Sequence, residues 1–126
     1  MNAIHVDATK EGRPLVWQAA PDPSIGPDEV LVDIHATALN RADLMQRAGN
    51  YPPPPGAPDI LGLEMAGVIR QVGADVRGWQ VGDRVCALLP GGGYAEQAAA
   101  PQAMLMPLPQ GWSFEQAGAM PEVFLT

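Results

Sequence analysis

Fourteen prolines and fourteen glycines are spread over the 126 residues of this chain, so regular helices and strands must be short. Between these interruptions apolar and polar residues alternate, as in "EVLVDIHATAL" over residues 29–39. Alternation with a period of two is typical of strands that bury one face. We therefore expect a mainly β domain of the α+β class, with many turns and a few short helices.

The charge balance and the apolar pattern exclude several classes of protein. Fourteen acidic against seven basic side chains give a net charge of −7, which repels nucleic-acid phosphates. No apolar run approaches the roughly 18 residues of a membrane span, and the first residues do not form a secretory signal. A single cysteine, Cys86, fits a reducing compartment. We expect a cytoplasmic protein of one domain that binds neither nucleic acid nor membrane.

Strands are expected in several places along the chain. "NAIHV" and "LVWQA" form a first pair, and "EVLVDIHATAL" follows after a turn-rich segment. "GLEMAGVIRQVG" and "GDRVCALLP" form a second pair, and the triple glycine of "PGGGYAEQAAAP" is a turn that enters another strand. "MLMPLPQG" is a short extended segment. The triple glycine lacks the spacing and the strand–turn–helix context of a phosphate-binding loop.

Helices are expected in three places. "NRADLMQRAG" has helical spacing, with Asn40 and Asp43 in its first turn, and Leu44 and Met45 facing inward. "SFEQAGAM" opens with Ser113 and a glutamine three residues later, the spacing of a capping box. "PEVFLT" is the first turn of another helix.

Glu64 stands alone as a carboxylate in the apolar run "ILGLEMAGVI". A buried charge is unfavourable unless it is paired or has a chemical role. Glu64 is therefore expected to bind a metal, to transfer a proton, or merely to mark the end of a strand. The two histidines and Cys86 lie on separate segments and do not have the clustered spacing of a zinc site. We expect His35 on the surface and Cys86 as a packed, unreactive thiol.

Tyr51 and Asn40 each allow two interpretations. Tyr51 precedes four prolines that hold it stiffly, so it is either an aromatic plug over the barrel or a phenol placed at a cleft. Asn40 is either only the N-cap of its helix or also a contact to a substrate or cofactor.

Several segments together resemble the medium-chain dehydrogenase/reductase superfamily, most closely its zinc-independent quinone oxidoreductase (zeta-crystallin-like) branch. They are "ALNRADLMQRAGNYPPPPGAPDILGLEMAGVI", "VGDRV", "ALLPGGGYAEQ" and "GAMPEVFLT". The resemblance covers residues 1–126 and implies only the N-terminal, GroES-like catalytic domain, a partly open β-barrel with short helices. It also implies that the Rossmann cofactor domain of such enzymes is absent from this chain.

The resemblance bears on the role of Glu64. Zinc-dependent members have Gly-His-Glu where this chain has Gly62, Leu63 and Glu64, and Cys-Gly-x-Asp where it has Asn40 to Asp43. The resemblance therefore implies no metal. Glu64 is then expected to be a structural anion, paired either with a base, Arg41 or Arg84, or with a backbone donor.

The function implied is hydride transfer from NADPH to a quinone or conjugated carbonyl compound, without metal. Asn40 and Tyr51 are the implied catalytic residues, and Asn40, Arg41, Met45 and Thr126 approach the cofactor. The full-length enzyme is expected to be a homodimer, and this chain alone is expected to be inactive and to bind NADPH poorly. The alternatives are an NADPH-dependent C=C reductase of alkenals or enoyl thioesters, and a non-catalytic GroES-like binding module.

Overall fold

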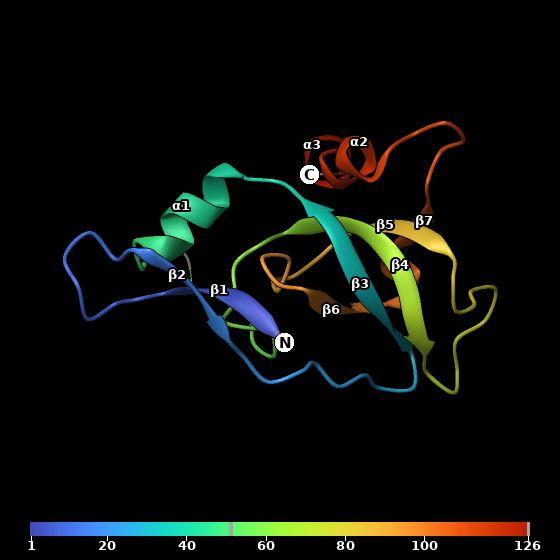
Figure 1. Ribbon diagram of the computed structural model, residues 1–126, viewed down its shortest axis with the longest axis horizontal. Coiled ribbons are helices and arrows are strands. Elements are labelled where there is room, and N and C mark those ends of the chain that lie inside the picture. The colour runs from blue at the N-terminus through green and yellow to red at the C-terminus, as the bar shows by residue number, and fades with distance from the viewer. Residues whose placement is uncertain (51, 126) are drawn as a thin grey trace.

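The computed structural model describes residues 1–50 and 52–125. It contains a five-stranded antiparallel sheet in the order β6-β3-β4-β5-β7 and a separate two-stranded hairpin, β1–β2 (Figure 1). The strands are β1 Asn2–Val6, β2 Leu15–Ala19, β3 Glu29–Thr37, β4 Glu64–Val72, β5 Arg84–Leu88, β6 Gln97–Pro101 and β7 Leu105–Pro107. Each strand lies within a segment that the sequence predicts to be extended.

The sheets do not close into a complete barrel. β6 and β7 form the two edges of the larger sheet, and the hairpin joins it near one edge through the segment before β6. There Ala3 pairs with Ala95, and the Ile4 N–H donates to the Tyr94 carbonyl at 2.8 Å. The expected mainly β, partly open architecture is confirmed.

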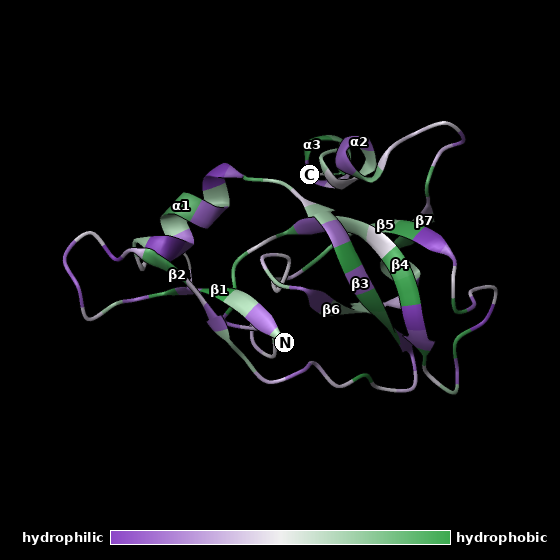
Figure 2. Ribbon diagram, in the orientation of Figure 1, coloured by the Kyte–Doolittle hydropathy of each residue, from purple (hydrophilic) through white to green (hydrophobic). Residues whose placement is uncertain are grey.

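The main core lies on one face of the five-stranded sheet. Val30 and Val32 of β3, Met65 and Ile69 of β4, and Val85 of β5 are buried together. Figure 2 shows hydrophobic colour along much of β3, β4 and β5, hydrophilic colour at the end of β4, and mixed colours in the loops. A smaller cluster, Ala66, Cys86 and Ala117, is buried on the opposite face, where α2 (Phe114–Gly118) covers β4 and β5.

β3 and β4 approach each other closely at Gly67. A Cβ at this position would lie 2.0 Å from the Asp33 carbonyl oxygen, inside the backbone of the neighbouring strand. The register between the two strands shifts nearby, between Ile34 and Ala36. Gly67 therefore allows the strand that carries Glu64 to pair with an irregular partner.

The helices are short: α1 Arg41–Arg47, α2 Phe114–Gly118 and α3 Pro121–Leu125, with a 3-10 turn at Gln102–Met104. α2 and α3 lie together beyond one end of the larger sheet, and α1 lies beside the hairpin (Figure 1). The capping box of α2 is confirmed, since Ser113 Oγ accepts from the Gln116 N–H at 3.1 Å. No helix within residues 1–50 and 52–125 has the length and apolar character to cross a membrane.

The expectation that Leu44 and Met45 face inward is wrong. They are 64% and 43% exposed, and the buried residue of α1 is Asp43. Polar contacts hold both ends of the helix: Asp43 at the start, and at the end the Arg47 guanidinium, which donates to the carbonyls of Arg13 and Gly12 at 2.9 Å each. Because these contacts fix α1, its apolar side chains stay on the surface.

Candidate functional site

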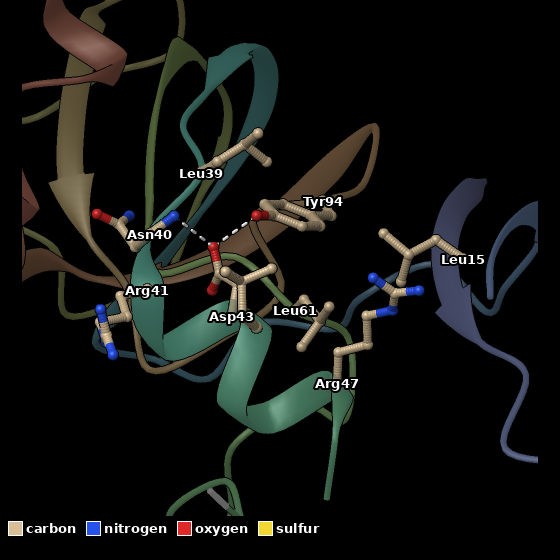
Figure 3. Close-up of a pocket in the computed structure, with 9 residues that line it drawn as sticks. Leu15, Leu39, Asn40, Arg41, Asp43, Arg47, Leu61 and Tyr94 are labelled. Atoms are coloured by element: carbon tan, nitrogen blue, oxygen red, sulfur yellow. Dashed lines mark hydrogen bonds between the residues drawn. The ribbon is translucent and has the colours of Figure 1, made fainter. Parts of the chain in front are cut away.

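Asn40 lies where the chain leaves β3 and enters α1, and its backbone is fixed in an extended conformation. Its N–H donates to Asp43 Oδ2 at 2.9 Å, while the Asp43 N–H donates to the Asn40 carbonyl at 3.0 Å. The N-cap role expected for Asn40 is confirmed. The side-chain amide extends away from the Asp43 carboxylate (Figure 3), so it can make a separate contact.

Tyr94 supplies a second donor to the same carboxylate oxygen. Its hydroxyl donates to Asp43 Oδ2 at 2.5 Å, and both side chains are buried (Figure 3). Burial, and then the hydrogen bond to Asp43, raise the pKa of the Tyr94 phenol above its usual value, so it stays protonated. Because this proton points at Asp43, Tyr94 holds the start of α1 and has no proton to offer a ligand.

The position of Tyr94 depends on the glycine turn before it. The Tyr94 N–H donates to the Leu61 carbonyl at 2.9 Å, and the Gly93 N–H donates to the Gly62 carbonyl at 3.0 Å. Gly92 has a φ of 91°, which confirms the expected turn with positive φ. Tyr94 is not among the site residues that the sequence predicts; the signal that could have found it is a phenol directly after a glycine turn.

Glu64 is buried, with 1% of its surface exposed, and each of its two oxygens accepts one hydrogen bond. Oε1 accepts from the Asn40 side-chain amide at 3.0 Å, and Oε2 accepts from the backbone N–H of Glu122 in α3 at 2.8 Å. Of the two expected kinds of partner, the backbone donor is confirmed.

The expected pairing of Glu64 with an arginine is wrong. Within the part of the chain that the structure describes, neither Arg41 nor Arg84 forms a salt bridge with it. The Arg84 guanidinium lies over the Phe114 ring instead, 4.5 Å from its centre. Both arginines are exposed, whereas Glu64 is buried and accepts hydrogen bonds from neutral donors.

A cavity of about 480 Å³ opens beside this network (Figure 3). Its walls are mostly apolar, from Leu15, Leu39, Leu44, Leu61 and Tyr94, and its polar lining comes from the residues at the start and end of α1. Leu39 is 84% exposed and also lines an adjoining hollow of about 440 Å³. Exposed leucines around a hollow with a few polar groups are typical of a surface that binds an apolar ligand.

The structure brings three of the five selected site residues together on one short segment. Asn40 caps α1 and Arg41 is its first residue, and Arg41 and Met45, four residues apart, share a face of the helix. Both are exposed, and no described carboxylate pairs with Arg41. The other two selected residues, Tyr51 and Thr126, lie outside the described residues.

Histidine, cysteine and carboxylate side chains do not gather into a possible metal site anywhere in residues 1–50 and 52–125. His35 is exposed and stacks on Phe114 with ring centres 4.3 Å apart, which confirms its surface position. Cys86 is buried, as expected. Burial, and then the charge of Glu64, raise the pKa of the Cys86 thiol, so the reactive thiolate is disfavoured.

Comparison with known proteins identifies the family. Residues 26–110 match the alcohol dehydrogenase GroES-like domain, so the chain belongs to that family. The fold and its relatives place it in the medium-chain dehydrogenase/reductase superfamily, among neighbours that include quinone oxidoreductases and VAT-1-like proteins.

Three similar proteins show the range of this neighbourhood. The human synaptic vesicle membrane protein VAT-1 homolog-like is 36% identical over 89% of this chain and 26% of its own length. The trans-enoyl reductase tazE of Aspergillus terreus is 34% identical over 93% of this chain and 43% of its own. The quinone oxidoreductase of Thermus thermophilus, solved also with NADPH, is 36% identical with a TM-score of 0.75, over 96% of this chain and 37% of that one. The chain thus spans less than half the length of each.

Proposed function

We propose that this chain is the catalytic-domain portion of an enzyme that transfers hydride from NADPH to a quinone without a metal. The observation that carries the proposal is the fixed Asn40 at the start of α1, with exposed Arg41 and Met45 after it and an apolar cavity beside it. The similarity to quinone oxidoreductases, one of them solved with NADPH, supports the choice of reaction and cofactor.

The residues present fit the nicotinamide end of such a cofactor. The side chain of Asn40 can hydrogen-bond polar groups near the ring, Met45 offers an exposed apolar surface, and Arg41 is a cation that no described carboxylate neutralises. Thr126 is proposed as a further contact. When bound, NADPH supplies the hydride; this chain holds the acceptor and the nicotinamide end in an aligned pose.

The acceptor oxygen needs a hydrogen-bond donor as negative charge develops on it. The chain has two tyrosines, and Tyr94 already donates to Asp43. We assign this donor to Tyr51, whose phenol is protonated near neutral pH in its unperturbed state. A quinone is itself strongly electrophilic, so one such donor and good alignment replace the Lewis acid that alcohol dehydrogenation requires.

Replacing Tyr51 by phenylalanine in the complete protein should lower kcat about tenfold and leave the fold intact. Loss of one preorganised donor lowers rates by about 10²–10³ in acyl transfer, and a reactive quinone depends on it less. Steady-state kinetics with a thermal melt of each protein tests this. An unchanged kcat would leave Tyr51 as an aromatic plug only.

A C=C reductase of alkenals or enoyl thioesters is the second candidate, favoured by the similarity to a trans-enoyl reductase. Both reactions would use the same cleft. A panel of quinones, alkenals and enoyl thioesters, assayed for NADPH oxidation by the complete protein, separates them. A kcat/KM for quinones at least about tenfold above that for enoyl thioesters supports the first function, and the reverse order supports the second.

The proposal extends to the domain organisation, compartment and oligomeric state of the enzyme. Residues 1–126 act as the GroES-like catalytic domain, and a Rossmann domain outside them binds most of the NADPH. The complete enzyme is a cytoplasmic homodimer with a small-molecule quinone or conjugated carbonyl substrate.

A further inference from the structure

Glu64 joins two parts of the chain that lie far apart in the sequence. One carboxylate oxygen holds the Asn40 side chain, at the start of α1, and the other holds the N–H of Glu122, 58 residues away in the first turn of α3. We propose that Glu64 is a positioning residue, which fixes the Asn40 amide and α3 relative to each other and so sets the orientation that Asn40 presents to a ligand.

The surroundings of Glu64 support a positioning role. Its side chain is buried, and neutral hydrogen-bond donors rather than a described cation satisfy it. The residue is also fixed through its backbone, because the Thr37 hydroxyl at the end of β3 donates to its carbonyl at 2.7 Å. A rigid, fully used carboxylate on the central strand β4 can hold two short helical elements in place without taking part in chemistry itself.

The Asn40 amide gains a defined orientation from this contact. A free asparagine amide rotates, and it can present either its oxygen or its nitrogen to a neighbour. The Glu64 carboxylate can accept hydrogen bonds but cannot donate one, so the nitrogen of the Asn40 amide, not its oxygen, must face it. Asp43 already fixes the backbone of Asn40, so the contact with Glu64 determines only the direction of the Asn40 side chain.

The first test replaces Glu64 by methionine, which keeps an unbranched side chain of similar length but removes both oxygens. Hydrogen exchange of the complete protein, followed by mass spectrometry, should show the Glu122 amide exchanging at least about tenfold faster, with amides of β4 and β5 little changed. Glu115→Met, at an exposed carboxylate in α2, is the matched control. It should change the exchange neither of the Glu122 amide nor of the amides in β4 and β5. Unchanged exchange at Glu122, or equal acceleration at all amides, would overturn the proposal.

The second test is a double-mutant cycle on activity, and this part rests on the proposed function. If Glu64 acts through Asn40, Glu64→Gln should lower kcat severalfold alone and produce no further loss in an Asn40→Ala background. Glutamine retains one acceptor for two donors, so this variant also serves if the methionine variant does not fold. Effects that multiply would contradict a positioning role. If the wild-type protein oxidises no NADPH, the proposed function fails, while the exchange experiment still decides whether the Glu64 carboxylate holds the first turn of α3.

Discussion

Replacing Gly62 by alanine should destabilise the fold by about 2–6 kcal/mol, a large part of the stability of a domain this size. Gly62 has a φ of +110°, and a Cβ there would lie 2.5 Å from the Gly93 Cα and 2.6 Å from the Tyr94 nitrogen. Backbone strain from the positive φ and overlap of the added Cβ with backbone atoms therefore both destabilise the variant. The clash falls on the turn that positions Tyr94, so the Tyr94–Asp43 hydrogen bond should be lost as well. Urea denaturation gives the free-energy change.

Gly78→Ala is the matched control for this prediction. Gly78 also has a positive φ, +81°, but a Cβ there would meet no atom within 4 Å. It should lower the free energy of unfolding by only about 1 kcal/mol, from backbone strain alone. Equal effects at the two positions would mean that the close approach of Gly62 to Gly93 does not contribute.

Replacing Asp43 by alanine should lower the free energy of unfolding by about 3–5 kcal/mol. Two donors to Oδ2 lose their acceptor: the buried Tyr94 hydroxyl and the partly buried Asn40 N–H. The start of α1 would lose its anchor, and Asn40 its fixed backbone. Chemical denaturation measures the loss, and the complete protein should also lose activity.

Asp43→Asn should be far milder, at about 1 kcal/mol, because it can keep both hydrogen bonds. Both donors use Oδ2, and Oδ1 is buried with no hydrogen-bond partner among the described residues. An asparagine can therefore place its single oxygen where Oδ2 lies. The corresponding amide change should be more harmful at Glu64, where each oxygen has its own donor. An asparagine variant as unstable as the alanine variant would contradict this description of the network.

Local features of the fold could be predicted from the sequence. The capping box at Ser113 and Gln116, and the hairpin pairing of residues 2–6 with 15–19, depend on residues close in the chain. The direction in which α1 faces could not be predicted in the same way. Helical spacing shows that Leu44 and Met45 are neighbours on the helix, but it does not show whether they face the core. The orientation of α1 depends on contacts from Arg47 to the Gly12 and Arg13 carbonyls, which are distant in the sequence.

The candidate site could be predicted only in part, for the same reason. The N-cap position of Asn40 could be predicted because the start of a helix is a local pattern, whereas its place in the site was implied by the family resemblance. Tyr94 was missed because its partner, Asp43, is 51 residues away. Glu64 was correctly expected to need a partner, and a backbone donor was one of the two kinds expected, but the only residues that could be named for it were arginines. Its actual partners include a backbone N–H, which every residue but proline carries and no sequence pattern marks.

The central claim, metal-free hydride transfer from NADPH to a quinone, is tested most directly by an assay of the complete protein after exhaustive dialysis against a metal chelator. NADPH oxidation at saturating quinone should proceed at the rate of the undialysed protein, with no metal bound in proportion to protein by elemental analysis. The Asn40→Ala variant, assayed alongside, should be at least about tenfold slower because the nicotinamide end loses a fixed contact. Activity that disappears on dialysis and returns with added zinc, or an Asn40→Ala variant as fast as the wild type, would contradict the account.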